Sequence, residues 1–200
     1  SDVYKRQQLI HSKVIASYLR QLLRNDLQYA PFRMEGMEQD VREMMEIDTP
    51  QGKLALQIGG TIDRLDSKGD TLRIVDYKTG GTPKTPENIE QLFTPADNRP
   101  NYIFQTFLYA AILCRKQSLK VAPSLLYIHR AASESYSPVI EMGAPRQPKV
   151  PVNNFAFFED EFRERLHGLL QEIFSQEETF SQTEDTRKCE YCDFRSLCKR

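Results

Sequence analysis

A strand–turn–strand pattern over residues 53–77 constrains the fold more than any other feature of the sequence. Apolar and polar or small residues alternate from Lys53 to Ile58, which predicts a half-buried strand that runs on to Asp63. The SKGD run at residues 67–70 is typical of a hairpin turn, and the apolar segment Leu72–Tyr77 predicts the returning strand. The chain should therefore contain an antiparallel pair at its centre.

Helical and strand periodicities elsewhere place this pair in an α/β arrangement. The other expected elements are a helix over Tyr4–Gln28, a strand over Phe32–Ile47, a helix over Tyr102–Arg115, a strand over Leu125–His129, a weak strand over Val139–Met142 and a helix over Phe157–Phe174. Between them, Thr79–Asn101 is proline-rich and lacks sustained periodicity, so we expect a long mobile loop. This order predicts a central mixed β-sheet flanked by helices.

Length and charge narrow the class of protein. The 200 residues with 40% hydrophobic side chains match a single domain with one core, and no apolar run is long enough to span a membrane. A net charge of −1 neither favours nor excludes a nucleic-acid partner. The sequence starts in an expected helix without an initiator Met, which suggests a fragment of a larger protein. The uneven spread of four cysteines favours a reduced, cytoplasmic setting.

Two carboxylates and an amine should meet where the hairpin strands end. Asp76 and Lys78 are two residues apart, so they share one face of a strand, and Asp63 should lie on the neighbouring strand. Hard divalent cations such as Mg²⁺ or Mn²⁺ prefer carboxylate oxygens, and a lysine beside such a cation can orient or deprotonate a water molecule. An ordinary surface hairpin with an Asp–Lys salt bridge is the alternative interpretation of these three residues.

The longer pattern GTIDRLD…IVDYKTG resembles the core motif of the PD-(D/E)XK nuclease superfamily, in the branch that holds the RecB and AddB nuclease domains and their CRISPR-associated relatives. The resemblance implies a restriction-endonuclease-like fold. It also implies that Asp63, Asp76 and the backbone carbonyl of Tyr77 bind metal and that Lys78 is catalytic. A downstream Gln-x-x-x-Tyr motif of that family is matched by Gln105 and Tyr109, which lie one helical turn apart.

Two further positions of the family are less clearly matched. An upstream glutamate often completes the metal site, and Glu38 is our candidate, with Glu35 as the alternative. Many relatives carry a histidine on an N-terminal helix. His11 lies on the expected first helix but lacks the glycine-rich lead-in of that motif, so an ordinary helix-surface histidine is the favoured interpretation.

The C-terminal segment 186–200 is rich in cysteine. The spacing Cys189-x2-Cys192-x5-Cys198 resembles the tail of AddB-type nucleases, where three such cysteines and one upstream cysteine hold a [4Fe–4S] cluster. We expect that cluster in the intact protein, with the fourth ligand upstream of this sequence. Zinc or an empty tail is the alternative. Cys114 lies on an expected core helix and is interpreted as a small buried hydrophobic residue.

The resemblance implies a metal-dependent DNA nuclease, in particular an exonuclease that acts in recombination and double-strand break repair beside a helicase domain or subunit. Basic residues in the expected loops are candidates for phosphate contacts, namely Lys84, Arg99, Arg146 and Lys149. A catalytically idle DNA-binding or structural module with the same fold is one alternative function. A zinc-stabilised interaction domain organised around the tail is the other.

Overall fold

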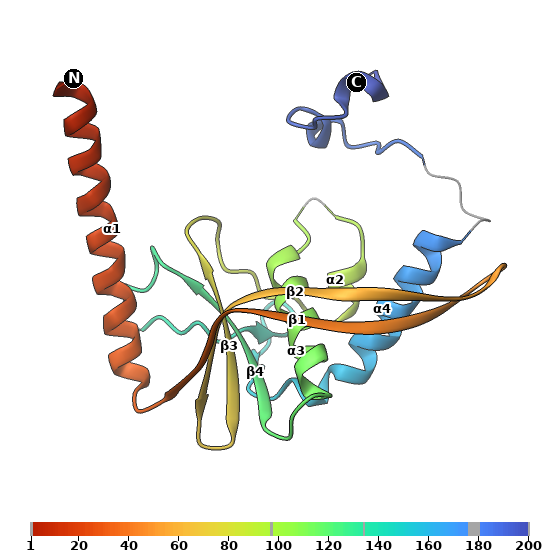
Figure 1. Ribbon diagram of the computed structural model, residues 1–200, viewed down its shortest axis with the longest axis horizontal. Coiled ribbons are helices and arrows are strands. Elements are labelled where there is room, and N and C mark those ends of the chain that lie inside the picture. Colours follow the sequence, from red (N-terminus) through yellow and green to blue (C-terminus); the bar gives the residue numbers. More distant parts are fainter. Residues whose placement is uncertain (1, 97, 134, 176–180, 200) are drawn as a thin grey trace.

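A four-stranded mixed sheet forms the centre of the computed structural model, which describes residues 2–96, 98–133, 135–175 and 181–199; the side chains of residues 2–11 are not described. The strand order is β1-β2-β3-β4 (Figure 1). The strands are β1 (Arg33–Thr49), β2 (Gly52–Lys68), β3 (Thr71–Lys78) and β4 (Lys120–Tyr127). β2 pairs antiparallel with β1 on one side and with β3 on the other, and β4 lies parallel to β3. The expected mixed sheet is confirmed.

β1 and β2 form a long two-stranded arm that extends beyond the rest of the sheet (Figure 1). They pair along their whole length, whereas β2 pairs with β3 only from Arg64 to Lys68. Within the arm, Gly59 adopts φ +142°, and a Cβ there would lie 2.0 Å from the Val41 carbonyl oxygen on the paired strand. No residue but glycine fits at this close approach.

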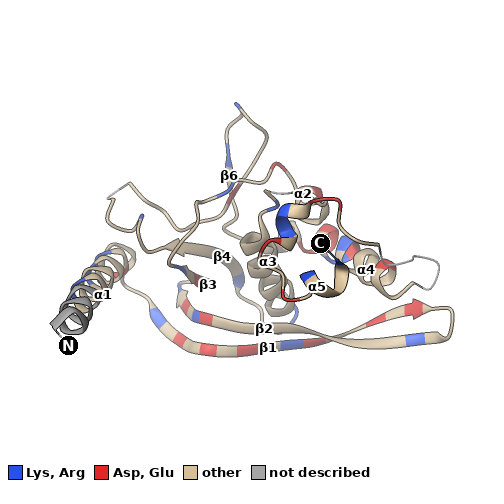
Figure 2. Cartoon of the chain, turned by 90° about the horizontal axis from the view of Figure 1, so that it is seen from above, with Lys and Arg blue, Asp and Glu red and all other residues tan. Residues whose placement is uncertain are grey.

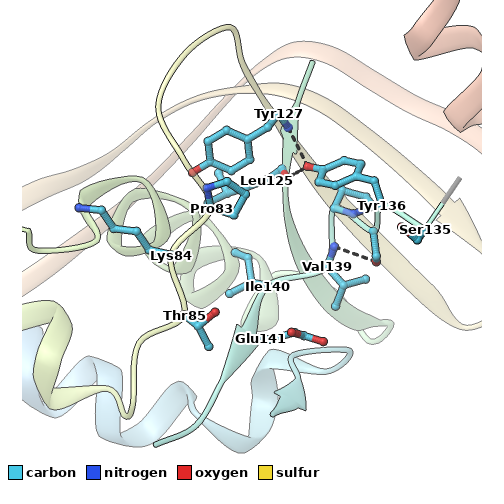
Figure 3. Close-up of a pocket in the computed structure, with 12 residues that line it drawn as sticks. Pro83, Lys84, Thr85, Leu125, Tyr127, Ser135, Tyr136, Val139, Ile140 and Glu141 are labelled. Atoms are coloured by element: carbon cyan, nitrogen blue, oxygen red, sulfur yellow. Dashed lines mark hydrogen bonds between the residues drawn. The ribbon is translucent and has the colours of Figure 1, made fainter. Parts of the chain in front are cut away.

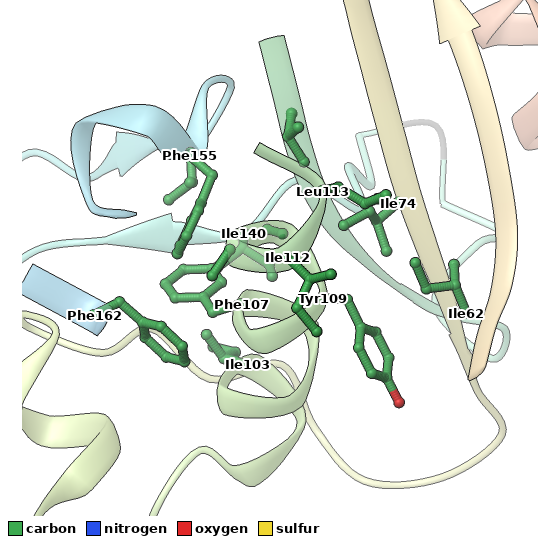
Figure 4. Close-up of a cluster of buried hydrophobic side chains, with 14 of the residues drawn as sticks. Ile62, Ile74, Ile103, Phe107, Tyr109, Ile112, Leu113, Ile140, Phe155 and Phe162 are labelled. Carbon is green, nitrogen blue, oxygen red and sulfur yellow. The ribbon is translucent and has the colours of Figure 1, made fainter. Parts of the chain in front are cut away.

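Two helices cover one face of the sheet, α3 (Asn101–Cys114) and α4 (Glu159–Phe174). α3 is apolar on nearly all sides, so it is buried between the sheet and α4, as expected of a core helix. Phe107, Phe155 and Phe162 are fully buried and pack with their ring centroids 4.9–6.2 Å apart. This aromatic cluster joins α3 to α4 beneath the sheet (Figure 4).

The first helix, α1 (Asp2–Tyr29), lies against the opposite face of the sheet (Figure 1). Tyr18 and Leu22 of α1 pack on a second buried cluster that includes Val75 of β3 and Leu126 of β4. Asp76 therefore lies in a strand that is buried on both faces. Such a position holds a polar side chain in a fixed orientation, because its neighbours on either side cannot move.

A buried ionic network fixes the C-terminal end of α1 to the β2–β3 hairpin. The Asp66 carboxylate is fully buried and accepts hydrogen bonds from Arg64 at 2.8 Å and from Arg73 at 2.8 and 2.9 Å. Arg64 also donates to Asp26 of α1 at 2.8 and 2.9 Å, and the Arg73 guanidinium lies 3.5 Å from the centroid of the Tyr29 ring. The network was not expected, because isolated charged residues in a hairpin usually face solvent.

The segment 79–101, expected to be a long mobile loop without periodic structure, is partly ordered by packing on the core. It contains the short helix α2 (Glu90–Phe93), and it inserts the fully buried side chains of Ile89 and Leu92 into the core. Two isolated apolar residues give no periodic signal, so the sequence pattern missed them. Lys84 joins the two ends of this segment, because its ammonium donates to the carbonyl oxygens of Asn98 and Arg99 at 2.7 and 3.3 Å. Its mobility stays a prediction.

Element bounds differ from the expected ones mainly around β4, which starts five residues before the expected Leu125 and ends two before the expected His129. Parallel pairing with β3 from Thr71 onward sets these bounds. The expected weak strand becomes a two-stranded ribbon. The remaining elements are β5 (Glu141–Met142), β6 (Val150–Pro151) and the short helices η1 (Phe155–Phe157), η2 (Thr186–Cys189) and α5 (Arg195–Cys198).

Candidate active site

Asp63 lies where β2 parts from β3. The last residue pair between these strands joins Arg64 to Val75, and Asp63 is the preceding residue of β2. Its Oδ2 accepts a hydrogen bond from the backbone N–H of Tyr77 at 2.8 Å, so the carboxylate closes the gap between the diverging strands. The expectation that the strand ends near Asp63 is wrong, because β2 continues to Lys68. The expected proximity of Asp63 to β3 is confirmed.

Asp76 and Lys78 form a close ion pair on one face of β3. The Lys78 Nζ lies 2.6 Å from Asp76 Oδ2, and the two side chains are only 16% and 6% exposed. The contact lacks hydrogen-bond geometry, and Asp76 Oδ2 is buried without a hydrogen-bond partner. A surface salt bridge would leave both groups in water, so the ordinary surface-hairpin interpretation does not describe this pair. The Lys78 ammonium also lies 4.2 Å from the centroid of the Tyr102 ring.

Burial raises the pKa of the Asp76 carboxyl above its usual value. The adjacent Lys78 ammonium opposes this rise, and the nearby negative charge of Asp63 adds to it. Because the charge of Asp63 raises the pKa of Asp76, the two carboxylates lie near one another. A cation bound between Asp63 and Asp76 would reduce the repulsion between their negative charges.

The donor set fits a hard divalent cation. The Asp63 and Asp76 carboxylates lie close together, and the orphaned Oδ2 of Asp76 is a buried oxygen that a cation would satisfy. Within the described ranges, no three His, Cys, Asp or Glu side chains already surround one point. A cation at this centre would thus draw its remaining ligands from other oxygens, such as the predicted Tyr77 carbonyl, substrate phosphate and water.

The predicted third carboxylate occupies an unusual backbone position. Glu38 is exposed on β1 with φ 47°, between the pairs Met37–Arg64 and Gln39–Ile62 and hence beside Asp63. A non-glycine residue at positive φ is uncommon and costs energy, which marks positions that the rest of the fold imposes. The role of Glu38 as a ligand stays a prediction.

The two less clear candidates lie elsewhere. Glu35 sits at a β-bulge and accepts a hydrogen bond from Ser67 Oγ at 2.5 Å. His11 is part of α1, but its side chain falls outside the described part of the chain. Its role stays a prediction.

Gln105 and Tyr109 face the same side of α3, as their spacing predicts. The Gln105 amide donates to the Tyr109 hydroxyl at 2.9 Å. A Cβ added to Gly60 of β2 would lie 2.5 Å from that hydroxyl oxygen, so the Tyr109 ring rests directly on the backbone three residues before Asp63. The pair therefore contacts the strand that carries Asp63, and glycine at position 60 permits the contact.

Replacing Gly60 with Ala should displace Tyr109 and disturb the active site. The added methyl would also lie 2.9 Å from a ring carbon, so the ring must shift, at a cost of roughly 1–3 kcal/mol in the free energy of unfolding. Chemical denaturation measures this loss. Gly168→Ala on α4 is the matched control, because no atom lies within 4 Å of its added Cβ and alanine favours a helix. Equal stability of the two variants would contradict the contact.

The cysteines divide as the sequence suggests. Burial raises the pKa of the Cys114 thiol to about 11, which fits an inert core residue. Cys189, Cys192 and Cys198 are free thiols on and between η2 and α5. Because no metal-binding group of three is assembled among the described residues, their role as cluster ligands stays a prediction.

Of the four basic loop residues, two hold their own loops closed. Lys84 bridges the ends of segment 79–101, and Lys149 donates to the carbonyl oxygens of Gly143 and Ala144 at 2.6 and 2.7 Å. Charge along β1 is mainly acidic (Figure 2). Phosphate contacts by these loops stay predictions.

Sequence reasoning missed Tyr102, whose ring touches the Lys78 ammonium. The nearest sequence signal was the position of this aromatic residue, directly after the proline-rich segment and three residues before Gln105.

The mixed sheet thus brings two carboxylates and a lysine together where its strands diverge, a set of side chains that suits a divalent cation. The family model of the PD-(D/E)XK nuclease superfamily matches residues 3–199, and the chain belongs to this superfamily. A search of curated proteins found none that matches the chain. Of the helices that the structure describes, none is both long and apolar enough to cross a membrane.

Proposed function

We propose that this protein is a Mg²⁺- or Mn²⁺-dependent deoxyribonuclease whose centre is Asp63, Asp76 and Lys78. The buried Asp76 oxygen without a hydrogen-bond partner, paired with Lys78 and close to Asp63, carries the proposal. Asp63 and Asp76 together carry one more negative charge than Lys78 offsets, and a bound cation would compensate it, whereas a structural or merely DNA-binding module needs no such arrangement. Membership in a nuclease superfamily supports the same reaction class.

In the proposed reaction the residues have distinct tasks. Asp63 and Asp76 hold the cation, which when bound neutralises charge on the scissile phosphate. Lys78 lies within reach of the same region and orients the attacking water by hydrogen bonding, or accepts its proton. The Tyr77 backbone N–H fixes the Asp63 carboxylate. Gln105 donates to the Tyr109 hydroxyl, and Tyr109 packs on Gly60 of β2. This contact keeps Asp63 in register with β3.

The finer proposal is an exonuclease of the RecB and AddB kind. It would act in DNA recombination and double-strand break repair in the cytoplasm, with a helicase domain or subunit as partner and a [4Fe–4S] cluster on Cys189, Cys192 and Cys198 of the intact protein. The support is the GTIDRLD…IVDYKTG pattern together with the cysteine spacing. The exonuclease mode, the repair role, the helicase partner and the [4Fe–4S] cluster are each independent of the proposed metal-dependent nuclease activity.

Linear and covalently closed circular DNA of the same sequence separate the exonuclease from an endonuclease. The protein should degrade end-labelled linear single- or double-stranded DNA in Mg²⁺ or Mn²⁺ and leave the circular form intact. Asp76→Ala should be inactive on both. Cleavage of the closed circle would refute the exonuclease assignment, and no metal-dependent cleavage of either form would refute the nuclease.

Metal binding should strengthen with rising pH. Because the pKa of Asp76 is raised, the folded protein binds its proton more tightly than the unfolded chain does. Without metal, this contribution to stability is therefore present at low pH and lost as pH rises through the raised pKa. A cation binds the ionised form, so the increase in melting temperature caused by Mn²⁺ should grow as pH rises through the raised pKa of Asp76. Thermal melts measure it, and a Mn²⁺ effect that is independent of pH or unchanged in Asp76→Asn would contradict it.

A further inference from the structure

A cavity of about 320 Å³ opens directly beside Lys78. The residues that carry the argument are Gly81, Lys84, Arg99, Tyr102 and Tyr127. Tyr102 is the second residue of α3, and the centroid of its ring lies 4.2 Å from the Lys78 ammonium. Tyr127 is the residue of β4 that pairs with Lys78 of β3. Two residues that line the cavity are thus neighbours of Lys78, so the cavity adjoins the candidate active site. Its volume falls at the lower end of the range for small-ligand sites, roughly 300–1,000 Å³.

Two tyrosine rings flank the backbone at Gly81. A Cβ placed there would lie 3.6 Å from the Tyr102 ring and 3.8 Å from the Tyr127 ring, and Gly81 has φ +79°. Tyr127 is buried. The Tyr136 hydroxyl accepts a hydrogen bond from its backbone N–H at 2.8 Å. Tyr102 is 45% exposed, although it is aromatic and touches the catalytic lysine. An exposed aromatic ring at such a position is available to stack on a planar group.

The charges around the cavity suit phosphate. Lys84 and Arg99 line it, and none of the described residues that line it is acidic. Lys84 is held at the rim by the carbonyl oxygens of Asn98 and Arg99. A neighbouring cavity of about 270 Å³, on the other side of Pro83 and Lys84, contains Glu141 instead; Figure 3 shows Lys84 extending away from it. Anionic groups should therefore prefer the cavity beside Lys78.

We propose that this cavity binds one unstacked nucleotide of a single DNA strand, with its base stacked on Tyr102 and its phosphate near Lys84 and Arg99. The inference rests on the proposed nuclease function and names its substrate form. A base within a duplex is covered on both faces by its neighbours, so only a single-stranded segment or a frayed end can present a free face to the ring. Tyr102 is then the residue that selects single strands at the active site.

Binding without cleavage tests the inference. Fluorescence anisotropy of a labelled single strand, in Ca²⁺ or EDTA, compares the wild-type protein with Tyr102→Ala, Tyr102→Phe and Phe157→Ala. Phe157 is the matched control, because it is a strongly exposed aromatic residue that does not line the cavity. Tyr102→Ala should weaken binding on the order of tenfold, as for loss of one base–aromatic stack, whereas Tyr102→Phe and Phe157→Ala should bind like wild type.

A fully abasic strand of equal length completes the test. It should bind the wild type more weakly than the normal strand, and Tyr102→Ala should not weaken it further, because the ring then has no base to contact. An equal loss on abasic DNA, an equal loss on duplex, or no loss at all would overturn the inference. Cleavage of single strands that is unaffected by Tyr102→Ala would also overturn it while leaving the nuclease intact. Tyr102-dependent binding without metal-dependent cleavage would instead overturn the nuclease.

Discussion

Lys78→Ala should lower the rate of DNA cleavage on the order of a thousandfold, within the range for removing a positioned acid–base group. The carboxylates of Asp63 and Asp76 are untouched, so the increase in melting temperature caused by Mn²⁺ should persist. Loss of Lys78 also removes the group that lowers the pKa of Asp76, so metal binding should require a higher pH than in the wild type. Single-turnover cleavage and thermal melts across pH measure these effects.

Lys53→Ala is the matched control for that experiment. Lys53 also pairs with a carboxylate, Glu46, at 3.6 Å, but both side chains are largely exposed at the far end of the β1–β2 arm. Its removal should leave cleavage unchanged. Full activity of Lys78→Ala would show that the lysine is only a structural partner of Asp76.

Asp66→Ala should destabilise the fold by about 3–5 kcal/mol, the range for removing one partner of a buried ion pair. The Asp66 carboxylate is fully buried and is bound by both Arg64 and Arg73. Its loss leaves the buried Arg73 guanidinium without its carboxylate partner and weakens the attachment of α1 through Arg64. Denaturant unfolding of the variant measures the loss in free energy.

Asp70→Ala provides the comparison for that loss. Asp70 lies four residues further along the same hairpin and pairs with Lys120, but both side chains are exposed. It should change the free energy of unfolding far less than Asp66→Ala does. A loss of similar size at both positions would mean that the Asp66 network does not hold the hairpin and α1 together.

The central part of the site was predictable because backbone periodicity determines it. A strand places residues two apart on one face, and a short turn fixes which residues of a hairpin lie opposite one another, so Asp63, Asp76 and Lys78 had to converge. The Gln105–Tyr109 pair follows from helical spacing in the same way. Local rules of this kind need no knowledge of tertiary packing.

Features that depend on tertiary packing were not predictable in the same way. Nothing in the sequence shows that β2 parts from β3 at Asp63 or that Glu38 adopts a positive φ, because local residue patterns do not determine where paired strands diverge. The burial of Ile89 and Leu92 rests on contacts with helices distant in sequence. The Asp66–Arg73 pair could have been found from the hairpin register, which places these residues opposite one another.

Metal-dependent cleavage by the purified protein is the most direct test of the proposed centre. Labelled linear single-stranded DNA is incubated with the wild type or with Asp76→Asn, which keeps the shape of the side chain and removes its charge, in Mg²⁺, Mn²⁺ or EDTA. The buried Asp76 carboxylate, paired with Lys78 and close to Asp63, predicts cleavage by the wild type in either metal, none in EDTA and none by Asp76→Asn. Cleavage that survives in Asp76→Asn or in EDTA, or a wild type that does not cleave in either metal, would contradict it.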